Sequence, residues 1–185
     1  MNYYISDTHL GHEESIGPTW DNRPFKNVFE MDEKIIKNWN NTVNNNDNVY
    51  ILGDFAYTLI HPDVCYYLEQ LKGKKHLLIG NHEEAIMENE KAKEYFESIQ
   101  LIKEIEDNGK KIVLCHFPIA EWNGYDRNYW HIYGHVHNCL RNSFGYLKNI
   151  EKALNAGCMI NNYKPATFEE LVINNKIFKE NNNPI

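Results

Sequence analysis

Eight side chains of the types that bind divalent metal ions recur along the chain in five short motifs. They are carboxylates, imidazoles and one carboxamide: Asp7 and His9 in SDTH, Asp54 in LGDF, Asn81 and His82 in IGNHE, His116 in LCHF, and His135 and His137 in YGHVH. Oxygen and nitrogen donors of this kind suit a divalent transition metal better than calcium or a thiolate-bound zinc. Eight donors exceed the needs of one tetrahedral ion, and they would fit two ions that share a bridging carboxylate.

The motif IYGHVHN places two imidazoles one residue apart. On an extended backbone, successive side chains alternate, so His135 and His137 would point to the same side. That side is either a polar surface or a single site at which both rings converge. Taken alone, D-x-H, G-D and G-N-H are more often turns or helix caps, and His116 is more often a core histidine, whereas G-H-x-H is the most informative single motif. It is their common position that indicates a site.

That common position is the end of a strand. Strand-like segments cover 2–6, 49–52, 75–80, 111–115, 130–134 and 153–157, and helix-like segments cover 30–43, 61–73, 84–99 and 168–174. This alternation predicts an α/β fold with largely parallel strands. In such sheets the site lies at the carboxyl ends of the strands. Gly53, Gly80 and Gly134 directly precede candidate ligands, where the lack of Cβ permits close approach of the backbone.

Composition limits the class of protein further. The chain has 185 residues, 42% of them hydrophobic, which predicts one folded domain over 1–185. A net charge of −7 argues against stable binding of duplex nucleic acid. The four cysteines form no C-x-x-C pair, and neither a signal peptide nor a membrane span is apparent, so we expect a cytoplasmic protein with reduced thiols.

The ordered series D-x-H, G-D, G-N-H-E, a lone histidine after a strand, and G-H-x-H resembles the signature of calcineurin-like metallophosphoesterases. The match runs from Asp7 to His137. The segments RPF and HFPIAEWNG are similar to those of the small stand-alone bacterial and phage members. The resemblance implies a four-layer α/β/β/α sandwich of two mixed β-sheets flanked by helices, with a two-metal site at the loop edge.

The resemblance also implies roles for single residues. Asp7, His9 and His137 would hold the first ion, Asn81, His116 and His135 would hold the second, and Asp54 would bridge them. His82 would face the substrate as a catalytic residue, to stabilise phosphoryl oxygens or protonate the leaving group. Glu83 would orient the His82 ring.

The implied activity is hydrolysis of phosphate mono- or diesters, by a water or hydroxide that the two ions activate. The acidic chain favours small, nucleotide-like substrates, and manganese is the preferred metal, with iron, cobalt, nickel or zinc as alternatives. The second motif reads GDFAYT and lacks the Asp and Arg of protein Ser/Thr phosphatases, which argues against that role. The alternative class is a catalytically inactive metal-binding scaffold for protein assembly, against which the presence of His82 argues. The sequence does not predict an oligomeric state.

Other residues keep two interpretations. Arg23 is either a phosphate clamp or part of a surface turn, and His12 either lines the site or packs beside it. The aromatic residues between the fourth and fifth motifs either stack a nucleobase or cover the edge of the core: Trp122, Tyr125, Tyr129 and Trp130. We expect structural roles for His61, His76, His131 and Cys115.

Overall fold

The computed structural model describes residues 1–141 and 143–184, whose strands form two four-stranded sheets. The first sheet holds β1 (Asn2–Ile5), β2 (Asn48–Ile51), β3 (Lys74–Leu78) and β4 (Phe96–Gln100). The second sheet holds β5 (Ile102–Asp107), β6 (Lys110–Cys115), β7 (Trp130–Tyr133) and β8 (Ala153–Asn155).

The direction of the strands differs between the sheets. The first sheet, in the order β1-β2-β3-β4, is entirely parallel. In the second, β6, β7 and β8 are parallel, whereas β5 pairs antiparallel with β6 across the turn at Asn108 and Gly109, both of which have positive φ. The expected pair of sheets is confirmed, but only the second sheet is mixed.

The helix α1 (Val28–Thr42) confirms the helix expected over 30–43. It begins where the Asn27 side chain accepts a hydrogen bond from the Glu30 amide at 2.9 Å. Met31, Ile35 and Trp39 form its buried stripe. This stripe packs on the first sheet, which fixes the loop that precedes α1 close to the end of β1.

The prediction of one helix over 84–99 is wrong. That segment contains α3 (Glu84–Met87), α4 (Glu90–Lys93) and the start of β4. The Asn89 side chain caps α4 by accepting from the Ala92 amide, which separates the two short helices. Strand β5 is also not expected from the sequence.

The remaining helices differ mainly in length. Of the expected helix 61–73, only α2 (Cys65–Leu68) is α-helical, and α5 (Phe144–Leu147) is an additional short helix. The C-terminal helix α6 (Phe168–Asn181) is longer than the expected 168–174. Thr167 and Glu170 form a capping box at its start. The 3₁₀ segments are η1 (Glu13–Ile16), η2 (Tyr125–Arg127) and η3 (Cys158–Ile160).

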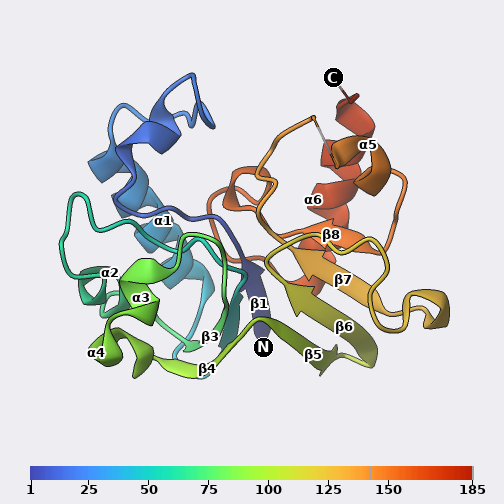
Figure 1. The fold of residues 1–185 in the computed structure, drawn as a ribbon, viewed down its shortest axis with the longest axis horizontal. Helices are drawn as coiled ribbons and strands as arrows, with labels where there is room; N and C mark the ends of the chain where they lie inside the picture. Colours follow the sequence, from blue (N-terminus) through green and yellow to red (C-terminus); the bar gives the residue numbers. More distant parts are fainter. Residues whose placement is uncertain (142, 185) are drawn as a thin grey trace.

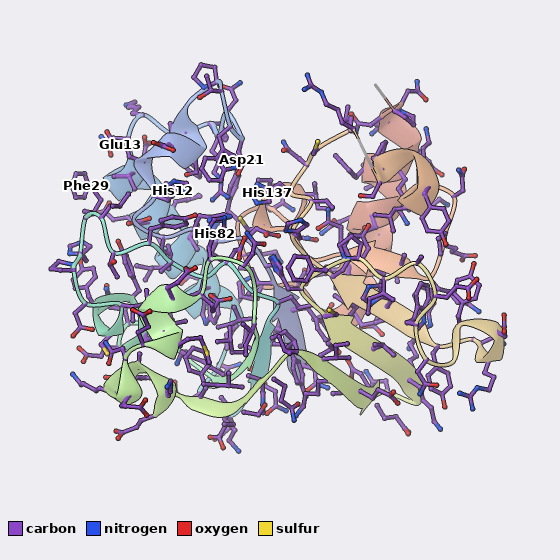
Figure 2. All side chains as sticks on the ribbon, in the orientation of Figure 1. His12, Glu13, Asp21, Phe29, His82 and His137 are labelled. Atoms are coloured by element: carbon purple, nitrogen blue, oxygen red, sulfur yellow. The ribbon has the colours of Figure 1, made fainter. Side chains whose placement is uncertain are left out.

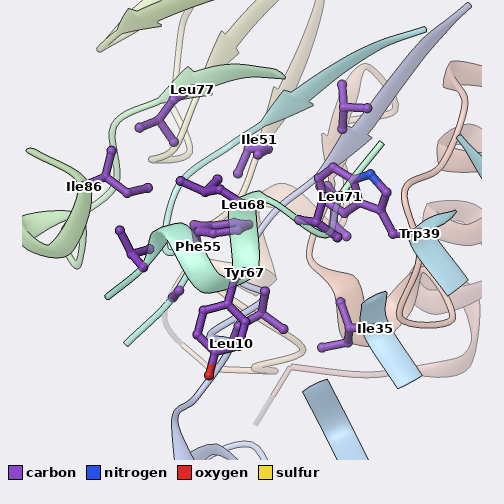
Figure 3. Close-up of a cluster of buried hydrophobic side chains, with 14 of the residues drawn as sticks. Leu10, Ile35, Trp39, Ile51, Phe55, Tyr67, Leu68, Leu71, Leu77 and Ile86 are labelled. Carbon is purple, nitrogen blue, oxygen red and sulfur yellow. The ribbon is translucent and has the colours of Figure 1, made fainter. Parts of the chain in front are cut away.

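Three buried clusters hold the layers together, and Figure 1 shows the resulting order, with α1–α4 beyond the first sheet and α5 and α6 beside the second. The first cluster lies between the first sheet and the helices α1–α4, whose side chains surround Ile51 and Leu77 of that sheet (Figure 3). Between the sheets, Tyr4 and Leu52 meet Leu114 and Ile132, and α6 closes this cluster. The third cluster covers the outer face of the second sheet with α5 and Trp122. Each large buried side chain contributes about 1.5–3 kcal/mol, so the strand ends rest on a rigid base.

Within the described residues, every helix is too short or too polar to cross a lipid bilayer.

Candidate metal centre

The five motifs come together at one edge of the two sheets, after β1, β2, β3, β6 and β7. Backbone hydrogen bonds join them: the Asp7 amide donates to Gly53, and the Gly134 amide donates to His116. Across the sheets, the His135 amide donates to both oxygens of Asp7, at 3.0 and 3.1 Å. Figure 2 shows His12, His82 and His137 gathered where the two halves of the molecule meet.

One group of donor atoms consists of side chains from the first, second and fifth motifs. One ligand atom from each of four residues lies within 4.8 Å of all the others: Asp7, His9, Asp54 and His137. The Nε2 atoms of His9 and His137 are 3.1 Å apart, and His137 Nε2 lies 3.5 Å from Asp7 Oδ1. With metal–ligand bonds of about 2.1 Å, neighbouring ligand atoms are separated by roughly 3.0–3.4 Å. These four residues therefore form a candidate metal site.

A second group of donors lies beside the first. The Asn81 Oδ1 atom is 2.9 Å from His116 Nε2 and 2.9 Å from His135 Nδ1. Asp54 faces both groups, with Oδ1 at 3.6 Å from His116 Nε2 and Oδ2 at 3.8 Å from His9 Nε2. All seven residues expected to bind metal are thus brought together, in two groups that meet at one carboxylate.

The electrostatics of the first group suit a bound cation. Burial raises the pKa of the Asp7 carboxyl, so its charged form lacks compensation that a cation would supply. Burial also lowers the pKa of His9 well below its ordinary value, which favours the neutral, metal-binding form of the ring. The Nδ1 atom of His9 is buried and has no hydrogen-bond partner among the described residues.

The backbone is strained at the candidate ligands. Five of them have left-handed φ values between 47° and 69°: Asp7, His9, Asp54, His135 and His137. The GHVH segment is therefore not extended, and the argument from strand alternation is wrong for it. The two rings contact different donors at the same site: His135 Nδ1 contacts Asn81, whereas His137 Nε2 contacts His9.

The glycines before the ligands are required by close contacts. A Cβ on Gly134 would collide with Ser6 Oγ and lie 2.9 Å from Asp7 Oδ2. A Cβ on Gly53 would lie 2.5 Å from His116 Nδ1, and one on Gly80 would collide with Asp54 Oδ1. The structure thus confirms the expected close approach of the backbone at Gly53, Gly80 and Gly134.

Glu83 does not orient the His82 ring as expected. Its carboxylate is buried and accepts hydrogen bonds from three backbone amides, those of Asp54, Phe55 and Gly80, at 2.8–3.0 Å. Burial raises the pKa of Glu83 to about 7. Its role in this geometry is to join the second and third motifs.

Arg23 is not on the cavity surface as a phosphate clamp would be. Its side chain is fully buried. Nη1 donates to the carbonyl of Thr8 at 2.7 Å, and Nη2 donates to the carbonyl of Asp7 at 2.9 Å. The Nε and Nη2 groups also donate to Asp21 Oδ2, at 3.0 and 2.9 Å. These contacts use the guanidinium inside the protein, so neither a phosphate contact nor a surface turn describes it.

Asp21 is a site residue that was not predicted from the sequence. Its Oδ1 atom accepts a hydrogen bond from His137 Nδ1 at 2.6 Å, across 116 positions of sequence. Burial raises the pKa of Asp21, but His137 and Arg23 outweigh burial, and the net effect is a lowered pKa. Asp21 and Arg23 are two residues apart in the sequence, and the tertiary fold brings His137 to them.

An open cavity of about 490 Å³ lies over the donor groups. Its lining includes Asp54, Asn81, His82, His135 and His137, together with Trp20, Arg141 and Ser143. The His82 amide donates to Asp54 Oδ1 at 3.0 Å, which holds this residue beside the metal donors. Trp20 is 39% exposed, and with Arg141 it was not predicted as a site residue.

His12 lies behind the cavity wall rather than on it. Its side chain is 2% exposed and stacks on Tyr57 with the ring centroids 3.9 Å apart. Trp20 packs edge-on against it at 4.4 Å. The expected substrate contact of His12 does not fit this burial, which instead places His12 as support for Trp20.

The residues expected to be structural lie outside the cavity lining. His131 is fully buried, Cys115 is buried, and His61 stacks on Tyr66. His76 is hydrogen-bonded to Ser98. Of the aromatic residues between the fourth and fifth motifs, Trp122 and Tyr129 pack on β6 and β7, and Trp130 packs edge-on against Phe168, whereas Tyr125 is exposed. Their position favours the interpretation as cover for the core.

Comparisons with known proteins agree with this architecture. The sequence matches the calcineurin-like phosphoesterase family over residues 3–153. It is 35% identical over 173 residues to an uncharacterized protein of Methanocaldococcus jannaschii, an alignment that covers 92% of this chain and 88% of that protein. The crystal structure of a protein of unknown function from Aquifex aeolicus is similar, with a TM-score of 0.69, 32% identity, and coverage of 92% and 96% of the two chains.

The chain therefore belongs to the calcineurin-like phosphoesterase family. This membership and the candidate metal site together define a metal-dependent phosphoesterase.

Proposed function

We propose that the protein is a dinuclear phosphoesterase that hydrolyses mono- or diesters of small, nucleotide-like substrates. The observation that carries the proposal is the position of Asp54, whose two oxygens face separate donor groups on the floor of the cavity. A bridging carboxylate between two ions needs this placement. The whole chain 1–185 acts as one catalytic domain, since α6 packs against both β1 and β8.

The donor set supports the assignment of ligands. Asp7, His9 and His137 would hold the first ion, Asn81, His116 and His135 would hold the second, and Asp54 would contribute to both. When bound, the ions lower the pKa of a coordinated water and neutralise charge on phosphoryl oxygens. Manganese is the metal that we favour for this mixture of oxygen and nitrogen donors, with iron, cobalt, nickel and zinc as alternatives.

Besides the metal ligands, His82 is the side chain that we assign to catalysis. Its ring lines the cavity while its amide is fixed on Asp54. From there the imidazole hydrogen-bonds a phosphoryl oxygen or protonates the leaving group. A group placed in this way contributes about 10²–10⁴-fold to the rate.

The cavity supports the substrate class. Its volume of about 490 Å³ suits a small ligand rather than a protein surface. Among the described residues that line the cavity, Arg141 supplies a positively charged side chain, and Trp20 supplies a partly exposed aromatic ring. These side chains fit a substrate that carries both a phosphate and an aromatic ring.

The four free thiols are consistent with a cytoplasmic location.

The test is hydrolysis of mono- and bis-p-nitrophenyl phosphate, nucleotides and cyclic nucleotides by metal-free protein reloaded with each candidate metal. We expect turnover with manganese. His82→Ala should keep its metal and lose about 10²–10⁴-fold in kcat. Asp47→Asn is the control, because Asp47 binds the N-terminal amine and the Asn44 amide far from the cavity.

Two outcomes would contradict the proposal. Unchanged activity of His82→Ala would remove the assigned catalytic residue. Full metal loading without turnover of any ester would favour the scaffold for protein assembly instead.

A further inference from the structure

Asp21 lies outside the five motifs, in the segment between η1 and α1, yet its side chain reaches the first group of donors. It is only 5% exposed, and Oδ1 accepts the proton of His137 Nδ1 at 2.6 Å. A ring that donates from Nδ1 carries its lone pair on Nε2. That Nε2 atom is the one that lies 3.1 Å from His9 Nε2 and 3.5 Å from Asp7 Oδ1.

Arg23 fixes Asp21 in place. Two of its nitrogens donate to Asp21 Oδ2, at 3.0 and 2.9 Å, and leave Oδ1 for His137. The same guanidinium donates to the carbonyls of Asp7 and Thr8. Because the pair is buried, it is shielded from competing water. Asp21 and Arg23 thus connect the backbone of the first motif to a side chain of the fifth.

The two donor groups differ in this support. In the second group, the His116 ring donates from Nδ1 to a neutral acceptor, the carbonyl of Leu52, at 2.7 Å. In the first group, His137 donates to a carboxylate, which makes the imidazole a stronger donor to a metal. The other imidazole of the first group, His9, has a buried Nδ1 without a partner among the described residues. Of the two imidazoles in the first group, His137 is therefore the one whose tautomer is held by a hydrogen bond from Nδ1.

We infer that Asp21, held by Arg23, is a positioning residue that fixes the tautomer of His137 and sets the affinity of the first metal ion selectively. This inference rests on the proposed function in taking His137 as a ligand of that ion. Among the described residues, the side chain of Asp21 contacts Arg23 and His137 and makes no hydrogen bond or ion pair with Asn81, His116 or His135, the proposed ligands of the second ion.

The experiment is a titration of metal-free protein with Mn²⁺, followed by the signal of free Mn²⁺ in electron paramagnetic resonance. Asp21→Ala should weaken one of the two sites by about 10–100-fold and leave the other within about threefold. Asp21→Asn loses the charge and, with its one oxygen turned to Arg23, faces His137 Nδ1 with an NH2 donor, so it should weaken the same site as well. Asp47→Asn, which removes a carboxylate far from the cavity, should match the unmodified protein in both sites.

A second measurement needs neither metal nor activity. Long-range ¹H–¹⁵N spectra of the metal-free protein in mildly alkaline buffer report the tautomer of each histidine. We expect the proton of His137 on Nδ1, and its redistribution toward Nε2 in Asp21→Asn, which keeps the buried Arg23 partly satisfied if Asp21→Ala does not fold.

The failures can be told apart. Two sites of unchanged affinity in Asp21→Asn and Asp21→Ala, with the His137 proton still on Nδ1, would overturn the inference and leave the proposed function standing. Equal weakening of both sites would overturn the selectivity. Protein that binds no manganese before any substitution would overturn the proposed function and this inference with it.

Discussion

His131 should make the fold sensitive to acid. Its ring is fully buried, Nδ1 donates to the carbonyl of Val113 at 2.9 Å, and Nε2 accepts from the Ile119 amide at 3.1 Å. A proton on Nε2 would break the contact with Ile119 and place a charge in the core. Burial accordingly lowers the pKa of His131 from its ordinary value of 6.5 to about 4.

The sign and size follow from proton linkage. Between pH 6.5 and 4 the unfolded chain binds a proton at His131 and the folded chain does not, so stability falls as the pH falls. The difference in pKa corresponds to about 3 kcal/mol of unfolding free energy lost by pH 4. This loss is a large part of the stability of an ordinary domain.

The assay is urea unfolding of metal-free protein at several pH values from 7 to 4, for the unmodified chain and for His131→Gln. The glutamine keeps one of the two hydrogen bonds, so the variant should be less stable by about 1–3 kcal/mol at neutral pH. Because the other histidines occur in both proteins, their contributions cancel. The stability difference should therefore change by about 3 kcal/mol in favour of the variant toward pH 4, so that it vanishes or reverses sign. Parallel curves would refute the reasoning.

Three further substitutions test how the site and the fold are held. Gly134→Ala places a methyl group 2.9 Å from Asp7 Oδ2, so it should cost about 1–3 kcal/mol and reduce bound metal, whereas Gly145→Ala, with nothing nearer than 3.6 Å, should do neither in melting and metal analysis. Glu83→Gln removes one acceptor oxygen for buried amides, and urea unfolding should show a loss of about 1–3 kcal/mol in unfolding free energy. Unchanged stability would contradict the role of Glu83 in joining the second and third motifs. Thr167→Ala removes the capping box of α6 and should lower unfolding free energy by about 1 kcal/mol without a change in metal binding.

Much of the fold could be predicted from the sequence because strand ends and motifs coincide. The parallel strands before SDTH and LGDF are mostly buried, the strand before IGNHE ends in the buried pair Leu77 and Leu78, and α1 has a buried apolar stripe. Strands β4 and β5 were missed because most of their exposed positions carry Glu or Gln, which are also common on helices. Edge strands exposed on one side have no continuous apolar run.

The candidate ligands were predictable because each is marked by its local motif. Asp21 was not, since it lies in an irregular segment and meets His137 only through the tertiary fold. The burial of Arg23 and His12 has the same cause: both lie in the segment from the first motif to α1, whose packing has no local periodic pattern. Glu83 shows that a correct motif can still leave the role of a side chain open.

The central proposal is that the Asp54 carboxylate is shared by two metal ions, which together activate water for the hydrolysis of phosphate esters. The most direct test counts manganese ions per chain and measures hydrolysis of bis- and mono-p-nitrophenyl phosphate in the same samples, for the unmodified protein and Asp54→Asn. We predict two ions per chain and turnover for the former, and both weaker binding of the two ions and a loss of at least about 10²-fold in activity for the latter. Full activity of Asp54→Asn, or a single ion in fully active protein, would contradict the account.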